Sequence, residues 1–171
     1  MEEVRTFLLK EFRWAMDRQK LLSPFLNDRA KIDAVVQITK NLEEYPLKEY
    51  ASYALTHLQK QDVDLSPYRN TFIDVLFLTD NQSVLRNLSN IINQLPFDNY
   101  RESEFFDLLL SFIKNPTNKV ALHVYSIYNL IHFAKRYPEL IEEIRMVIHD
   151  KTEQKSPAYK VAVRNFEKAV S

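Results

Sequence analysis

Hydrophobic residues recur every three or four positions along nearly the whole chain, which is the spacing of amphipathic helices. In the first segment, for example, Val4, Phe7, Leu8 and Phe12 follow this spacing. The same pattern continues to the last residues and predicts a succession of helices separated by short breaks. The expected helices cover about residues 2–20, 28–45, 46–60, 66–79, 81–95, 101–114, 117–136, 138–151 and 157–170.

Capping residues and prolines mark the expected ends of these helices. Asp28 is expected to cap the second helix, because its side chain can accept a hydrogen bond from a free N–H group of the first turn. Ser66 is expected to cap the fourth helix, with Pro67 in its first turn. Tyr45 should end the second helix, since a residue before proline is pushed out of the α region. Six of the seven prolines stand at such boundaries, and Pro24 lies in a loop.

The second helix of each successive pair carries an apolar ladder at positions 0, +4, +7 and +11 from an anchor residue. The anchors Ala51, Val84, Val120 and Ala162 are separated by 33, 36 and 42 residues. Spacings of this size are typical of helical repeats, in which each helix pair buries one face against its neighbours. The sequence therefore predicts an all-α superhelix of about four antiparallel helix pairs. It would form a single domain over residues 1–171, with residues 2–20 as a capping helix.

Over about residues 28–171 the chain resembles the HEAT/ARM-like families of α-α superhelices. Val84-Leu85-Arg86 is similar to the valine–arginine pairing of the second HEAT helix. The proline that this family often places inside its first helix is missing. Tetratricopeptide repeats have a similar period, but their small glycine position and repeated tryptophan have no match here. The resemblance implies a curved scaffold that binds through its concave face, and it implies no chemistry.

The composition removes several classes of enzyme. The chain has no glycine, so it cannot form a Walker A loop, a dinucleotide-binding fingerprint or a nucleophile elbow, which all need glycines. It also has no cysteine, which excludes disulfides, thiolate metal sites and a cysteine nucleophile. The four histidines show no local metal-ligand spacing. Neither a metal nor another cofactor is therefore expected.

The charge balance argues against nucleic acid as the main partner. The 23 basic and 23 acidic residues give a net charge of zero, whereas nucleic-acid binding usually needs a basic field. No apolar stretch approaches the roughly 18 residues needed to span a bilayer. The first residues lack the apolar core of a signal peptide. We therefore expect a cytoplasmic protein without a membrane partner.

A polar ladder on the second helices is the main candidate for a partner-binding surface. If the apolar stripe faces the core, positions +3, +6 and +10 lie on one flank of each helix, at about 100° per residue. The candidate partner-binding residues are His57, Asn87, Asn90, His123 and Ser126, and the same flank carries Gln94 and Asn165. The alternative is that this flank is simply the solvated face of four amphipathic helices.

A basic stripe on the last helix is a second candidate. Lys160, Arg164 and Lys168 recur every four residues and would lie on one face. Such a stripe can contact phosphates or an acidic partner. The alternative is that it forms the polar outer face of a capping helix.

Three aspartates interrupt apolar stretches of the first helices. They are Asp33, Asp74 and Asp107, and the last two are 33 residues apart. Their recurrence predicts a structural role, in which each would bind a backbone group or an arginine of the neighbouring repeat.

Taken together, these features favour a non-catalytic binding or scaffold module that contacts another protein through a concave surface. One alternative is a nucleic-acid-binding protein like the HEAT-like DNA glycosylases, which depend on tryptophans of the inner face. The single tryptophan of this chain, Trp14, lies outside the second helices. Another alternative is a small all-helical enzyme, which would need a buried Asp or His with a shifted pKa. The partner and the oligomeric state are left open.

Overall fold

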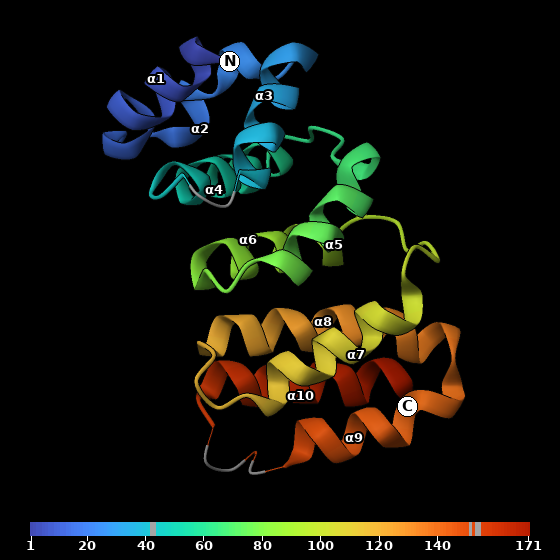
Figure 1. Cartoon of the computed structure of the whole chain (residues 1–171). Helices are drawn as coiled ribbons and strands as arrows, with labels where there is room; N and C mark the ends of the chain where they lie inside the picture. The colour runs from blue at the N-terminus through green and yellow to red at the C-terminus, as the bar shows by residue number, and fades with distance from the viewer. Residues whose placement is uncertain (42–43, 151, 153–154) are drawn as a thin grey trace. The chain divides into compact units, whose positions relative to one another are not determined.

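Helices form where the apolar periodicity predicts them. The computed structural model describes residues 1–41, 44–150, 152 and 155–171, and no strand occurs in this part of the chain. The helices are α1 (Glu2–Lys10), α2 (Arg18–Leu21), α3 (Arg29–Lys40), α4 (Leu47–Gln59), α5 (Arg69–Leu78), α6 (Gln82–Asn93), α7 (Glu102–Lys114), α8 (Val120–Arg136), α9 (Ile141–His149) and α10 (Pro157–Val170) (Figure 1). Short 3-10 turns cover Phe12–Trp14, Ser23–Phe25, Ser66–Tyr68 and Pro138–Leu140. The all-α expectation is confirmed.

The chain divides into two compact units, Met1–Ile91 and Ile92–Ser171. In the first unit α4 packs against α1, α2 and α3. In the second unit α8 packs against α7, α9 and α10, while α9 contacts α7 and α10 as well (Figure 1). Within the second unit, one helix pair thus contacts the next through both of its helices, as in a helical repeat. That residues 1–171 form one domain stays a prediction.

Phe133 of α8 lies at the centre of an aromatic cluster in the second unit. Its ring centroid lies 4.9 Å from Phe97, 5.3 Å from Phe106 and 6.0 Å from Phe105. Three of these four rings are buried, and Phe97 is half-buried. Truncating a buried phenylalanine to alanine usually costs about 3–5 kcal/mol. This cluster therefore fixes the end of α8 against the start of α7.

Side-chain caps define several helix starts, although not all of those expected. Asp28 accepts a hydrogen bond from the N–H of Lys31 (3.1 Å), which confirms it as the cap of α3. The expected cap Ser66 is wrong, because this residue begins a 3-10 turn and α5 starts only at Arg69. Asp64 organises this start instead, since its carboxylate accepts from the N–H of Ser66 (2.9 Å).

The predicted helix over residues 2–20 is interrupted between α1 and α2. Asp17 accepts a hydrogen bond from the N–H of Lys20 (3.0 Å) and so caps a new short helix. A capping aspartate favours a helix start over a helix interior. The break leaves Trp14 70% exposed and Met16 fully exposed at the surface of the first unit.

The apolar ladder of α8 has a different phase from the one predicted. Val120, the expected anchor, is 38% exposed in the first turn of the helix. The buried residues of α8 include His123, Ile127, Leu130 and Ala134 along one line. A second buried stripe begins two residues after Val120 and consists of Leu122, Ser126, Asn129 and Phe133. This stripe keeps the expected 0, +4, +7 and +11 spacing, but it places polar side chains in the core.

The chain ends α4 without glycine at a position where helices commonly use one. Val63 donates from its N–H to the carbonyl of Leu58 (3.2 Å), and Asp62 donates to that of Gln59 (3.0 Å). These two bonds form a Schellman motif, whose left-handed residue is usually glycine. Asp62 takes that position with φ of 63°. Aspartate tolerates this conformation better than most residues with a Cβ atom.

Replacing Asp62 by glycine is expected to raise the free energy of unfolding by about 0.5–1 kcal/mol, because glycine has no Cβ to clash at positive φ. Asp62→Val should lower it by about 1–2 kcal/mol for the opposite reason. Thermal unfolding followed by circular dichroism would measure both. Asp80→Gly is the control, at a loop residue without positive φ, and it should lose stability. Equal effects of the two glycine substitutions would contradict the assignment.

Candidate functional site

Asn87, one of the predicted partner-binding residues, is buried and only 4% exposed. Its Nδ2 donates to the Ser52 hydroxyl of α4 at 3.0 Å, and its Oδ1 accepts from the guanidinium of Arg86. The Ser52 hydroxyl in turn donates to the carbonyl of Glu49 (3.0 Å). The amide of Asn87 therefore joins α6 to α4 inside the first unit rather than facing solvent.

His123 and Ser126 are also buried, which corrects the expectation that they lie on a solvated flank. His123 is 2% exposed, and its Nε2 lies 3.0 Å from the carbonyl oxygen of Asn115. Ser126 donates to the carbonyl of Leu122 at 2.8 Å. The reason is the shifted phase of α8, which turns these positions toward the core of the second unit.

His57 and Asn90 are the two members of the predicted ladder that are half-buried, although both ring nitrogens of His57 are themselves buried. The two residues lie on α4 and α6 of the first unit. The His57 ring packs edge-on against Tyr53, with centroids 4.7 Å apart, and against Phe12 at 6.1 Å. Burial lowers the pKa of His57, and the nearby cations Lys60 and Arg18 lower it further. The surroundings of His57 therefore favour the uncharged imidazole.

The basic stripe of α10 lies at the surface of the second unit. Arg164 and Lys168 are exposed and Lys160 is half-buried. Within the described part of the chain, none of the three forms an ion pair. These cations are accessible to an anionic partner, and whether one binds stays a prediction.

The three aspartates of the first helices have different surroundings. Asp33 is exposed, accepts a hydrogen bond from the Tyr68 hydroxyl and lies 3.6 Å from Arg29. Asp33 thus contacts the start of the next helix pair. Its partner there is a tyrosine side chain and not the predicted backbone group or arginine. Burial of Tyr68 and this hydrogen bond raise the pKa of the Tyr68 phenol to about 12. Asp74 is half-buried, whereas Asp107 is exposed. That Asp107 has a structural role stays a prediction.

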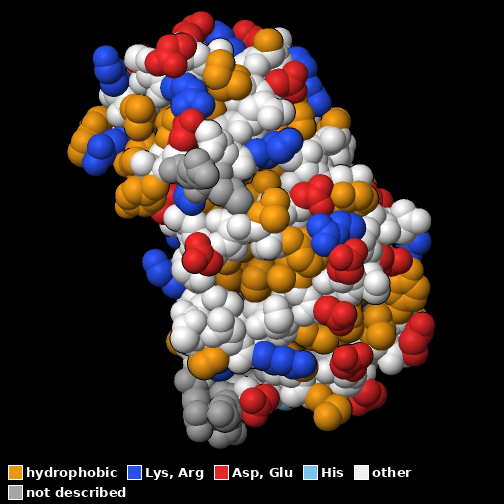
Figure 2. Space-filling view, in the orientation of Figure 1, with side chains coloured by type: hydrophobic (Ala, Val, Ile, Leu, Met, Phe, Trp, Pro, Cys, Tyr) orange, Lys and Arg blue, Asp and Glu red, His pale blue; other side chains and the backbone are white. Residues whose placement is uncertain are grey.

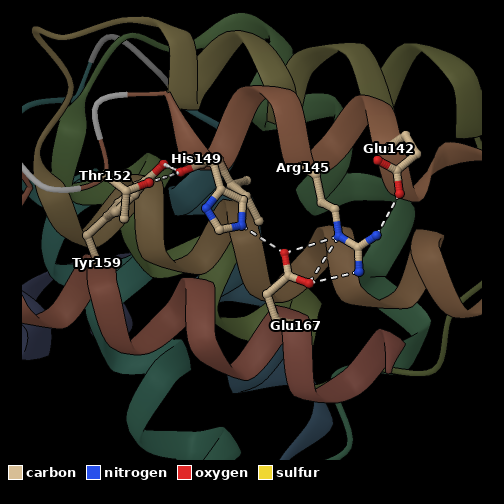
Figure 3. Close-up of polar contacts among 7 residues, drawn as sticks. Glu142, Arg145, His149, Thr152, Tyr159 and Glu167 are labelled. Carbon is tan, nitrogen blue, oxygen red and sulfur yellow. Dashed lines mark hydrogen bonds and ion pairs between the residues drawn. The ribbon is translucent and has the colours of Figure 1, made fainter.

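An ion-pair cluster joins α9 to α10. Glu167 accepts hydrogen bonds from Arg145 (2.9 Å from Nη2) and lies 2.8 Å from Nε2 of His149 (Figure 3). Arg145 also reaches Glu142 at 2.6 Å. Hydrogen bonds from Arg145, and then from His149, hold the pKa of the Glu167 carboxyl below its ordinary value.

This cluster contains a carboxylate–imidazole pair, which in enzymes can activate a hydroxyl nucleophile. The two hydroxyls drawn beside it have other partners: those of Thr152 and Tyr159 both donate to the carbonyl of Ile148, at 2.8 and 2.9 Å (Figure 3). Burial also raises the pKa of Tyr159 to about 12, which keeps this phenol protonated. The geometry therefore supports a structural role, in which these ion pairs join α9 to α10.

A pocket of 270 Å³, which we call the α7–α8 pocket, opens in the second unit. The start of α7 and the end of α8 form its walls. It is lined by Glu102, Ser103, Phe106, Asp107, Phe133, Tyr137, Glu139 and Leu140. Figure 2 shows acidic side chains beside hydrophobic ones on the face over α7. The floor of the pocket is aromatic and its rim is acidic.

Hydrogen bonds hold one wall of the α7–α8 pocket. The Tyr137 hydroxyl donates to Glu102 at 2.8 Å and accepts from Nε of Arg136 at 3.2 Å. The guanidinium of Arg136 lies 5.7 Å above the Tyr137 ring and 5.4 Å above that of Phe97. Glu102 is thereby partly neutralised, whereas Asp107 and Glu139 have no cationic partner among the described residues.

A larger hollow of 460 Å³ lies between the end of α7 and α9. Its lining mixes both signs of charge, which come from Lys114, Lys155, Glu143 and Asp150. This hollow therefore favours neither a cationic nor an anionic ligand.

Sequence patterns did not reveal the α7–α8 pocket. Its walls come from residues such as Glu102 and Tyr137, which are 35 positions apart and joined by a hydrogen bond. The one local signal of this pocket in the sequence is Asp107, a charged residue that lies in an apolar stretch and lines the pocket.

The described residues contain no group of three His, Asp or Glu side chains that could hold a metal ion. Among them, no helix is both long and apolar enough to cross a bilayer.

Replacing Asn87 by alanine is expected to lower the free energy of unfolding by about 1–3 kcal/mol, because it removes a buried hydrogen bond to Ser52. The double variant with Ser52→Ala should lose less than the sum of the single losses, since the residues interact directly. Urea denaturation would measure these energies. Asn165→Ala, at an exposed amide, is the control and should change stability by less than about 0.5 kcal/mol. An additive double variant would contradict the bond.

Stability is expected to fall as the pH drops below about 6.5, because burial lowers the pKa of His123 and of His57 in the folded state. The unfolded chain then binds protons that the folded chain does not. Glutamine retains a donor but does not titrate, so His57→Gln/His123→Gln should flatten the profile. Denaturation midpoints at pH 7.5, 6.5 and 5.5 would test this. An unchanged slope in the double variant would exclude these histidines as the cause.

Comparisons with known proteins agree with this architecture. A model of the HEAT repeat domain matches residues 8–170, which cover most of both compact units. No match is found among curated proteins or among solved structures. The match confirms the resemblance expressed in the helix-pair spacing. The chain therefore belongs to the HEAT repeat domain family.

Proposed function

We propose that the chain is a non-catalytic module that binds another protein through the exposed parts of its second helices. The observation that carries this proposal is the HEAT repeat match over residues 8–170, because repeats of this kind generally mediate protein interactions. Stacked helix pairs present extended surfaces that suit a macromolecular partner. The cytoplasm is proposed as its compartment, since a chain without cysteine suits a reducing environment.

The burial pattern limits which second-helix positions can serve. Asn87, His123 and Ser126 are buried, so they stabilise the core and do not contact a partner. Both ring nitrogens of His57 are buried, so this side chain cannot bond a partner in this conformation. Asn90 is half-buried, whereas Asn165 and Gln94, which directly follows α6, are exposed. Asn90, Gln94 and Asn165 supply uncharged hydrogen-bonding groups, which suit the polar surface of another protein.

Site-specific photo-crosslinking would test the proposal. Benzoylphenylalanine at Gln94 or Asn165 should capture a protein in cells that express the chain. The same group at Gln37 of α3 or Glu142 of α9, both exposed on first helices, is the matched control and should capture much less. Circular dichroism of each variant would establish that the fold is retained.

Each outcome separates the hypotheses. A protein captured from both Gln94 and Asn165, and not from the controls, supports the proposal. Capture from the controls alone would place the binding surface on the first helices and overturn it. A crosslink that nuclease digestion removes would favour nucleic acid, and the basic stripe of Lys160, Arg164 and Lys168 would then be the first place to look. No crosslink from any position would also overturn it.

A further inference from the structure

We propose that the α7–α8 pocket docks a partner segment that carries one bulky apolar residue flanked by lysine or arginine. The proposal rests on the proposed protein-binding function, and it adds a site that lies apart from the predicted ladder and a chemical class of partner. Three properties of the pocket support it: its apolar floor, its acidic rim and its size.

The apolar floor supplies the attraction for a bulky side chain. Phe106 is 7% exposed and Phe133 is 1% exposed, so both rings are held in place by the core behind them. Leu140 completes the apolar lining. A preformed aromatic surface of this kind binds an apolar anchor without having to order itself first. The neighbouring cluster of Phe97, Phe105 and Phe133 gives the floor its rigidity.

The acidic rim selects the charge of the partner. Glu102, Asp107 and Glu139 line the pocket, and no lysine or arginine is among the lining residues. Arg136 compensates only Glu102, at 3.6 Å. Asp107 and Glu139 are exposed and have no cationic partner among the described residues. Exposed charges of one sign steer a partner of the opposite sign and repel the same sign.

The size of the pocket favours a side chain over a free ligand. Sites for drug-sized ligands and cofactors usually enclose about 300–1,000 Å³. At 270 Å³, the α7–α8 pocket is smaller than this range. It can receive one large side chain of a peptide whose other residues lie along the rim. Such an arrangement places flanking cations next to Asp107 and Glu139.

A peptide-binding assay on the full chain would test this inference. The probe is a fluorescein-labelled hexapeptide, Gly-Lys-Arg-Phe-Arg-Lys. One matched peptide has serine in place of phenylalanine, and another has glutamate in place of each cation. Fluorescence anisotropy should show saturable binding of the probe with a Kd of about 100 μM or tighter. Each matched peptide should bind at least tenfold more weakly.

Surface variants locate the binding without disturbing the core. Ser103 is exposed and lines the pocket, so Ser103→Trp should fill its mouth and weaken binding at least tenfold. Ser111→Trp, at an exposed residue of the same helix outside the lining, is the matched control. The double variant Asp107→Lys/Glu139→Lys should likewise weaken binding of the probe peptide at least tenfold. Asp80→Lys, exposed in the first unit, should not.

Several results would overturn the inference. These are the absence of saturable binding, equal binding of the acidic peptide, and binding that Ser103→Trp leaves unchanged. Sedimentation that shows self-association abolished by Ser103→Trp would make the occupant a second copy of the chain, and so would overturn it too. Crosslinks from Gln94 and Asn165 do not involve the pocket. If they persist while the peptides fail, the proposed function stands and only this inference falls.

Discussion

The hydrogen bonding of buried and half-buried polar groups between second helices is the constraint on which the rest of this structure depends. A buried amide or hydroxyl that loses its partner costs about 1–3 kcal/mol, so two helices pack stably only where partners meet. In each unit such bonds join residues 32 to 39 positions apart, which is about one repeat. The pairs are Asn87 with Ser52, Gln59 with the Ile91 carbonyl, and His132 with the Asn93 carbonyl. These contacts determine which turn of one helix faces which turn of the next.

The helices could be predicted because apolar periodicity and caps are local properties of the chain. Most predicted ranges agree with α3 to α10, and the match to the HEAT repeat domain confirms the family. The failures have local causes that a period alone cannot reveal. Asp17 forms a cap inside an apolar pattern and so divides the first helix. In α8 the side chain of Ser126 bonds to the preceding turn, which allows a polar residue to occupy the buried stripe.

The candidate site was less predictable because the helix-wheel reasoning assumed one buried face per helix. In a repeat, a second helix has neighbours on several sides: α8 contacts α7, α9 and α10. Burial then extends over the flank that holds His123, and a polar residue in the sequence becomes a bonded core residue. The α7–α8 pocket was missed for a different reason. It depends on the distance between Glu102 and Tyr137 in space, which no spacing along the chain reports.

The exposed segment between α1 and α2 has a consequence for optical spectroscopy. Trp14 is the single tryptophan of the chain, is 70% exposed and has the guanidinium of Arg13 4.4 Å above its ring. Its emission therefore reports the solvent around a surface turn of the first unit, and it has little reason to change when the core of the second unit opens. The nine tyrosines are distributed over both units, from Tyr45 to Tyr159. Absorbance or emission of tyrosine is thus the intrinsic signal that follows the folding of the repeats.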